Sequence, residues 1–452
     1  MSEALIQKDH YRSQFQQLET NLNGQRGSLF HQVRQDAMAR FSELGFPTTR
    51  DEDWKYTNVA PIARTPFGMP TAGVTDGLPA GSLDRLKATF FGSLKGPLLV
   101  FVNGLFRPEH SELQGLPPGL TVQSLAAALQ QEPERVEPFL ARFAQYRDQA
   151  FVALNTAFLQ DGAFIHVARG SVIEEPVRVL FLSSGAAGPT ISHPRVLAVI
   201  EENAQATILE SYAGEGDGAY FSNAVSELIL GENSVLDHYK LQQDADGAYH
   251  VGTLQVYQAK SSTFASHSVS LGGLLTRNDA RARLDGEGCE TTLNGLFMVT
   301  GQQHVDNHTS MDHARARCNS REVYHGVLGG ESTGVFNGKI FVRQDAQKTD
   351  ARQTNRNLLL SRDAVIDTKP QLEIFADDVK CTHGATIGQL DEEAIFYLRA
   401  RGIPHGEARN MLTLAFASEV VNNIRVEPLR LRLETLVGGW LAAALAQEEA
   451  KR

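Results

Sequence analysis

Several common features are scarce or absent in this sequence, and each absence excludes a class of protein. The 452 residues include only three cysteines, which is an odd number. A framework of disulfides is therefore not expected, and we expect the protein to reside in a reducing environment. The first residues, MSEALIQKDHYRSQF, lack the apolar segment of a signal peptide. The longest apolar stretches, such as GPLLVFVNGLF, are too short to cross a bilayer. We therefore expect a cytoplasmic protein without a membrane segment.

An excess of positive charge is also lacking. With 42 Lys and Arg against 53 Asp and Glu, the net charge is −11, which argues against a broad surface for nucleic acid. The phosphate-binding loop of many ATPases is missing as well. In TGVFNGKI, Thr333 occupies the place of its first glycine, and Ile340 replaces its Ser or Thr. This chain is not expected to hydrolyse ATP by that route.

The chain begins and ends with helical patterns around a long β region. Apolar residues three and four apart predict helices up to about residue 45, and mixed elements follow to 150. From about 163 to 390, short runs rich in Val, Ile, Thr and Phe alternate with turn residues, which predicts strands. We therefore divide the chain into an N-terminal helical and mixed region (1–150), a β core (151–390) and a C-terminal helical region (391–452).

The last region carries clear helix signals. DEEAIFYLRARG has a plausible N-cap at Asp391 and a stop at Gly402. The next segment, HGEARNMLTLAFASEVVNNI, is predicted to place one set of apolar side chains on one face: Met411, Leu412, Ala415, Phe416 and Val420. These helices are expected to cap the β core, and an apolar face left exposed on them would mark a site for a partner.

The β region repeats weakly. A polar or glycine turn, then small residues, then alternating apolar positions recur near Asn203, Asn233, Ser262, Gly288 and Ser332, at steps of 30, 29, 26 and 44. Steps near thirty are the size of one coil of a β-solenoid, and the last step is interpreted as an insertion. A two-sheet sandwich is the alternative, but such domains are usually only ~100 residues long. We predict a parallel β-helix.

The segment HVDNHTSMDH holds three histidines. On a strand, His304, Asp306, His308 and Ser310 would point to one face, and His with Asp two apart can ligate a metal. The other interpretation, which we prefer, is a polar ladder on the outside of the solenoid, because no fourth ligand has the spacing of a known site. The role of His313 and of the group as a whole is left open.

The segment DVKCTHGATIGQL places Cys381 and His383 two residues apart, so both would project from the same face of a strand. A thiolate and an imidazole suit zinc, ferrous iron or an iron–sulfur species, and a Cys-His nucleophile pair is a further possibility. A half-buried cysteine beside a satisfied histidine is the plain alternative. Two ligands do not fill a tetrahedral site, so a metal here would need ligands from across an interface.

A long run of residues resembles a known family. NGKIFVRQDAQKTDARQTNRNLLLSRDAVIDTKPQLEIFADDVKCTHGATIGQLDEEAIFYLRARGI is similar to the core signature of the SufB/SufD family of iron–sulfur cluster assembly scaffolds. The motifs DTKPQLEI, DDVKC, HGAT and FYLRARGI occur in the family's order. Upstream, QHVDNHTSMDH and CNSREVYHGV fit the same family, and EDWKYT together with the overall length resembles its SufD branch.

The resemblance implies a fold and a set of partners. It implies a right-handed parallel β-helix between helical ends, paired with a SufB-like scaffold, with the C-terminal helices docking a SufC-like ATPase. Sulfur would come indirectly, from a cysteine desulfurase. His383 would lie at the SufB interface as a ligand or a proton-handling group for a transient, nascent iron–sulfur cluster, with Cys381 beside it. Cys289 and Cys318 are left as structural cysteines, and flavin use is undecided.

Two other classes compete with a non-catalytic scaffold. A β-helix polysaccharide lyase or hydrolase needs an acidic cluster or a Ca²⁺ site and usually secretion, and neither signal is visible. A metal enzyme built on HVDNHTSMDH would carry stoichiometric metal in the isolated chain. A homodimer is possible when the chain is alone, because the exposed edge of a β-helix can pair with a second copy.

Overall fold

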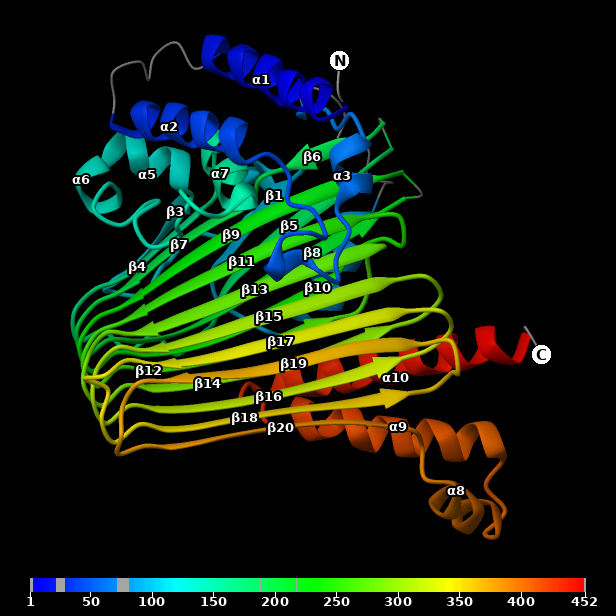
Figure 1. Ribbon diagram of the computed structural model, residues 1–452. Coiled ribbons are helices and arrows are strands. Elements are labelled where there is room, and N and C mark those ends of the chain that lie inside the picture. Colours follow the sequence, from blue (N-terminus) through cyan, green and yellow to red (C-terminus); the bar gives the residue numbers. More distant parts are fainter. Residues whose placement is uncertain (1–2, 22–28, 71–80, 187, 217, 451–452) are drawn as a thin grey trace.

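A computed structural model describes residues 3–21, 29–70, 81–186, 188–216 and 218–450. Its strands form two ten-stranded sheets that wind around one core in about eight turns, so the predicted parallel β-helix is confirmed (Figure 1). From β7 onward, successive strands alternate between the sheets, so the hydrogen-bonded neighbours within a sheet are mostly two strands apart in the chain. A right-handed coil is what the connection rule for parallel strands leads one to expect.

The first sheet has the order β2-β1-β5-β8-β10-β12-β14-β16-β18-β20. The second has the order β19-β17-β15-β13-β11-β9-β7-β4-β3, with β6 beside β9. The strand bounds are β1 (Leu98–Val102), β2 (Leu105–Phe106), β3 (Leu120–Ser124), β4 (Ala163–Val167), β5 (Val177–Ser184), β6 (Thr190–Ser192), β7 (Arg195–Ile200), β8 (Gln205–Glu215), β9 (Tyr220–Leu230), β10 (Val235–Gln243), β11 (Tyr249–Gln258), β12 (Thr263–Ser270), β13 (Leu275–Leu284), β14 (Glu290–Val299), β15 (His304–His313), β16 (Asn319–Leu328), β17 (Thr333–Val342), β18 (Asp350–Leu359), β19 (Val365–Ile374) and β20 (Lys380–Gly388).

One corner of the coil repeats with a regular step. A residue with positive φ is followed by a small buried residue that opens the next strand, and the positive-φ residues recur at steps of 30, 28, 27, 29 and 31: Asn203, Asn233, Ser261, Gly288, Arg317 and Lys348. The predicted insertion after Gly288 is therefore wrong. Ser332 precedes β17 at a different corner, on the second sheet, so the step of 44 joined two unlike turns. Left-handed backbone at each turn lets the chain change direction within few residues.

Alternation of side chains along the strands separates the core from two outer faces. Residues that point inward, such as Leu228, Ala282 and Met311, form one apolar cluster that runs along the lumen of the solenoid. Because the period along a strand is two and the strands pair in register, one inward residue stacks on another from coil to coil. This stacking fixes the position of each lumen side chain.

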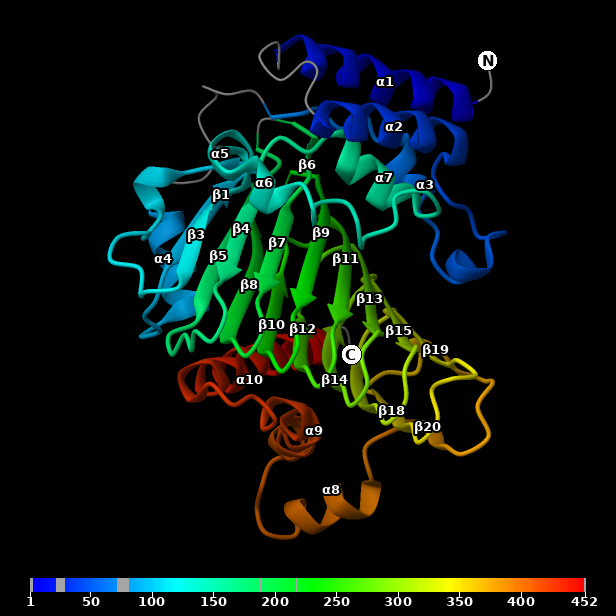
Figure 2. The same ribbon diagram turned by 90° about the vertical axis from the view of Figure 1, so that its left-hand side faces the viewer.

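The helices cover the outer faces and the first coils. Helices α1–α3 and α5–α7 pack on the second sheet and its first strands, whereas α4, α9 and α10 pack on the outer face of the first sheet (Figures 1 and 2). The helix bounds are α1 (Glu3–Asn21), α2 (Leu29–Leu44), α3 (Ala60–Arg64), α4 (Ser82–Phe91), α5 (Leu125–Gln131), α6 (Pro133–Val136), α7 (Ala150–Ala157), α8 (Glu392–Arg399), α9 (His405–Val421) and α10 (Glu427–Ala450), with 3-10 turns at Glu52–Trp54 and Pro108–His110. Across the described ranges, none of the helices combines the length and apolarity that a membrane crossing requires.

The predicted N-cap at Asp391 is confirmed, but the predicted face of α9 is partly wrong. The Asp391 side chain accepts a hydrogen bond from the Glu393 N–H (2.8 Å) and caps α8. Met411 and Ala415 are exposed, and the buried stripe of α9 is Ala408, Thr413, Ala417, Val420 and Val421. Small residues in this stripe let the helix lie close to β14 and β16, and a pattern based on large apolar residues does not detect them.

Candidate functional site

Cys381 and His383 lie on β20, the last strand of the first sheet (Figure 1). They are registered with Ala351 and Gln353 of β18, which both point into the lumen, so the predicted common face is confirmed. Cys381 is half-buried and packs against the lumen cluster. The His383 side chain is exposed and makes no hydrogen bond or ion pair with another described residue. The histidine is therefore available to an incoming group.

The edge of β20 is open. Every residue of this strand except Cys381 is exposed, and the strand ends the order of its sheet. The Lys380 N–H donates to the Thr349 carbonyl of the preceding coil (2.8 Å). Because the amides of a parallel strand alternate in direction, those of Cys381, His383 and Ala385 face the free edge. The two candidate ligands thus lie on a strand that still offers backbone groups for pairing.

The environment of Cys381 favours the neutral thiol in the free chain. Burial raises the pKa of the Cys381 thiol, and the nearby Asp350 carboxylate adds to the rise. A thiol is a weak ligand, and a bound cation favours its thiolate form. Cys381 is therefore expected to become a ligand only when a cation is already held by other groups.

Two buried polar residues lie behind His383 in the same column of lumen positions. Gln353 on β18 is registered with His383, and Glu322 on β16 is registered with Gln353. The Gln353 Nε2 group donates to Glu322 Oε2 at 2.8 Å. Burial raises the pKa of Glu322 to about 7. Sequence reasoning did not identify this pair.

The histidines of HVDNHTSMDH serve a different purpose. His304, Asp306 and His308 share the outer face of β15, as predicted, with His308 Nε2 3.1 Å from Asp306 Oδ1. The Thr57 hydroxyl is hydrogen-bonded to His304 Nε2 (2.9 Å) and also to Asp306. In the part of the chain that the structure describes, no three His, Cys, Asp or Glu side chains are grouped to hold a metal ion. The ladder binds the N-terminal segment to the second sheet.

Trp54 of the segment EDWKYT strengthens this attachment. The guanidinium of Arg277 lies 4.2 Å from the centre of the Trp54 ring, which is also 5.2 Å from Phe151. Arg277 in turn forms ion pairs with Asp279 (3.0 Å) and Asp306 (2.6 Å). These contacts anchor Trp54, and with it the N-terminal segment, on the second sheet.

The remaining candidates lie inside the solenoid, away from β20. His313 points into the lumen with its Nε2 2.9 Å from the Ser320 hydroxyl, and burial lowers its pKa to about 4. Cys289 and Cys318 occupy equivalent places at one corner of successive coils, and the Gly286 carbonyl oxygen lies 3.2 Å from the sulfur of each. None of the three adjoins His383, and the structural role given to the two cysteines suits their place in the turn.

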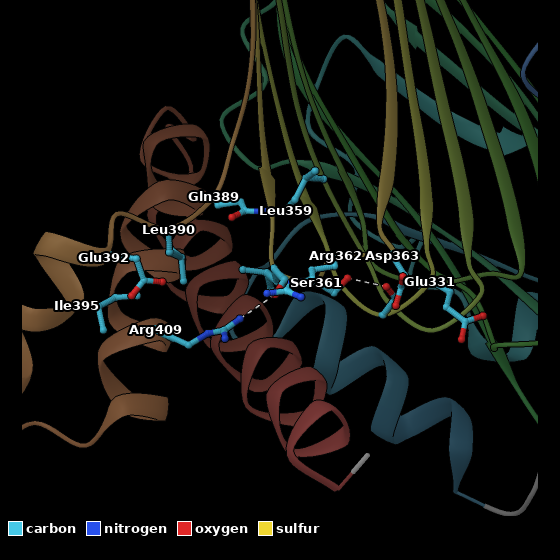
Figure 3. Close-up of a pocket in the computed structure, with 12 residues that line it drawn as sticks. Glu331, Leu359, Ser361, Arg362, Asp363, Gln389, Leu390, Glu392, Ile395 and Arg409 are labelled. Atoms are coloured by element: carbon cyan, nitrogen blue, oxygen red, sulfur yellow. Dashed lines mark hydrogen bonds between the residues drawn. The ribbon is translucent and has the colours of Figure 1, made fainter. Parts of the chain in front are cut away.

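A cavity of about 460 Å³ lies beside the end of β20 (Figure 3). It separates the turn after β18 from α8 and α9, and Arg409 on its wall donates to the Leu360 carbonyl (2.9 Å). Neither Cys381 nor His383 lines it. We therefore place the candidate site on the lumen face and free edge of β20 rather than in this cavity.

Comparison with known proteins identifies the family. A family model described as "SUF system FeS cluster assembly, SufBD core domain" matches residues 181–416, and one described as "SufBD protein N-terminal region" matches residues 6–179. An iron-sulfur cluster assembly SufBD family protein of Synechocystis is 32% identical over 450 residues, covering 97% of this chain and 98% of that protein. The iron-sulfur cluster assembly protein SufD of Escherichia coli is 32% identical over 407 residues, covering 89% and 91%. The chain therefore belongs to the SufBD family and has a role in iron–sulfur cluster assembly in the SUF system.

Proposed function

We propose that this chain is a non-catalytic scaffold subunit of a SufBCD-type complex, in which His383 and Cys381 contribute to a site for a nascent iron–sulfur cluster. The observation that carries the proposal is the exposure of β20 and of its candidate ligands. An unpartnered imidazole and a half-buried thiol share one face of a strand whose edge is unpaired. The cluster is the cargo of this site, which holds it only transiently.

A second scaffold chain is needed to complete the site. Two ligands are too few for a tetrahedral iron, and the described residues offer no further group of ligands. A SufB-like subunit that pairs with the free edge of β20 would bring its own side chains next to His383. When that subunit is missing, a second copy of this chain can use the same edge, which accounts for a possible homodimer.

The C-terminal helices are proposed to dock a SufC-like ATPase. Phe396 and Tyr397 of α8 are 72% and 57% exposed, and Met411 of α9 is 46% exposed. Neighbouring exposed apolar side chains of this size are uncommon on a monomer unless they face a partner. Because the chain lacks its own phosphate-binding loop, the ATPase would be a separate subunit, and its closure would move the two scaffolds as rigid bodies. We place this chain, as the scaffold subunit of that complex, in the cytoplasm.

The decisive experiment is to measure iron and acid-labile sulfide. The chain is co-expressed anaerobically with SufB-like and SufC-like partners, as wild type, as His383→Ala and as Thr382→Ala. Thr382 lies on the same strand but points away from the lumen, so it is the matched control. We expect His383→Ala to leave the complex intact and to lose most of the iron and sulfide, while Thr382→Ala keeps both. Equal loading in all three would contradict a ligand role for His383.

The docking surface is tested separately. We expect a double substitution, Phe396→Ser with Tyr397→Ser, to abolish co-purification of the ATPase and to leave pairing with the SufB-like chain unchanged. Leu431→Ser is the control, because Leu431 is also half-exposed (50%) but lies on α10. Retention of the ATPase by the double variant would remove α8 from the docking surface.

A further inference from the structure

The lumen side of the last coils contains a polar column that ends at His383. Glu322, Gln353 and His383 occupy registered positions on β16, β18 and β20. Neighbouring strands are about 4.8 Å apart, so side chains that point the same way from registered positions are within reach of one another. The column therefore connects the exposed histidine to two buried polar groups.

The Gln353 side chain is held in one place. It is 1% exposed, and its Nε2 group donates to Glu322 Oε2 (2.8 Å). Across the lumen its amide lies over Gly338 of β17, where an added Cβ would come within 2.2 Å of Gln353 Nε2. With the amide nitrogen bound to Glu322, the amide oxygen has a fixed position as well.

Gln353 and His383 each have an unmet hydrogen-bonding group. Gln353 Oε1 is buried and has no partner, although leaving a buried acceptor unpaired typically destabilises a fold by about 1–3 kcal/mol. His383, on the next coil, makes no hydrogen bond within the described residues. An imidazole N–H is the donor that this oxygen lacks, and the registered position of His383 is where that donor would come from.

We propose that Gln353, held by Glu322, is a positioning residue for His383. Its amide oxygen accepts one imidazole N–H, fixes the tautomer, and directs the lone pair of the other ring nitrogen out of the lumen. Histidines that bind metals commonly donate their second N–H to a carbonyl or carboxylate, which fixes the ring and raises its basicity. The use of this orientation in cluster assembly rests on the proposed function, but the orientation itself does not.

The test reads the histidine directly, without metal. The full chain is labelled with ¹⁵N in the histidine rings, and the two ring nitrogen shifts of His383 are assigned by their loss in His383→Gln. The variants are Gln353→Met, which keeps the volume but removes the amide, and Asn355→Leu. Asn355 is the matched control, because it is also a buried inward amide of β18 but is registered with Ala385, which has no ring to orient.

We expect one tautomer of His383 to dominate in the wild type and in Asn355→Leu, and to give way to a mixture in Gln353→Met. Glu322→Leu should have the same effect, because the amide then loses its support. Unchanged His383 shifts in folded Gln353→Met and Glu322→Leu would overturn the inference.

Iron and sulfide loading of the same variants separates the two proposals. If Gln353→Met mixes the tautomers and lowers loading several-fold, both are supported. If it mixes the tautomers while His383→Ala loads normally, the positioning pair stands and the ligand role of His383 fails.

Discussion

The two ends of the solenoid differ in how far their outward side chains are covered. At the first coils, Arg195 of β7 and Glu227 of β9 are fully buried on the outer face beneath the N-terminal helices. At the last coil, nearly all of β20 is exposed, and most of β19 is only half-buried. One end is covered by helices of its own chain, and the other end is exposed.

From this difference we infer that the first coils contribute more to stability and that the last coil contributes more to association. Glu227 accepts hydrogen bonds from the N–H groups of Ala141, Phe143 and Ala144 at 2.9 to 3.0 Å. It also forms an ion pair with Arg195. A buried charge with this many partners fixes one arrangement of the chain around it. No such network is seen on β20, so substitutions there should alter association more than folding.

The largest expected effect is on the closed end. Glu227→Ala would leave the Arg195 charge buried without a counter-ion and three N–H groups without an acceptor. We expect the free energy of unfolding to fall by about 3–5 kcal/mol. Urea unfolding of the isolated chain measures this loss.

The matched control lies in the same outward column at the open end. Gln371 of β19 follows Glu227 through Gln255, Arg281, Ser310 and Lys339 in register. We expect Gln371→Ala to change stability by no more than about 0.5 kcal/mol. Equal losses for the two variants would contradict the division between a stabilising end and an assembling end.

Between the two ends, Glu322 makes stability depend on pH. Its pKa is raised to about 7 by burial, so the folded chain keeps this proton over a range in which the unfolded chain has released it. Its contribution is present in full below about pH 4.3 and is lost as pH rises through about 7. We expect Glu322→Gln, measured against the wild type, to be relatively more stable at pH 8 than at pH 5, by up to about 3 kcal/mol. Thermal unfolding at the two pH values tests this, and parallel pH profiles would disprove the burial of an ionisable Glu322.

Much of the fold could be predicted because its signals are local. Turn residues and β-branched runs marked the strands, and the spacing near thirty marked the coils, as Asn203 and Asn233 show. The error at Ser332 arose because a coil has more than one corner, and polar small residues look alike at each. Which corner a serine occupies depends on strand pairing, which is a long-range property.

The candidate site was predictable only in part. Alternation along a strand placed Cys381 and His383 on one face, and the structure confirms it. Alternation could not identify Gln353 and Glu322 as their neighbours, because those residues lie 30 and 61 positions before His383 and meet it only through the register of three strands. The exposed state of Met411 was missed for a similar reason, since the packing of α9 on the sheet decides which face is buried.

The open end can be blocked without damage to the coil beneath it. Ala385 directs its N–H to the free edge of β20, so Ala385→Pro removes no hydrogen bond to β18. We expect at least a tenfold weaker association with the SufB-like partner, or with a second copy of the chain, and a loss of stability below about 1 kcal/mol. Analytical ultracentrifugation and urea unfolding give the two quantities. Unchanged association would show that the edge of β20 is not used for pairing.

The smallest effect is expected at the repeated corner of the coil. The two preceding coils have serine at the position where this coil has Cys289. Cys289 follows Ser234 and Ser262 in the column of small buried residues, and its thiol donates to the Ala259 carbonyl (3.1 Å). A serine hydroxyl can make the same bond, as Ser262 does to the same carbonyl at 2.6 Å. We expect Cys289→Ser to lower the free energy of unfolding by less than about 1 kcal/mol and to leave iron and sulfide loading of the complex unchanged. A loss of loading comparable to that of His383→Ala would mean that the interior of the solenoid takes part in cluster assembly, and that the open end does not act alone.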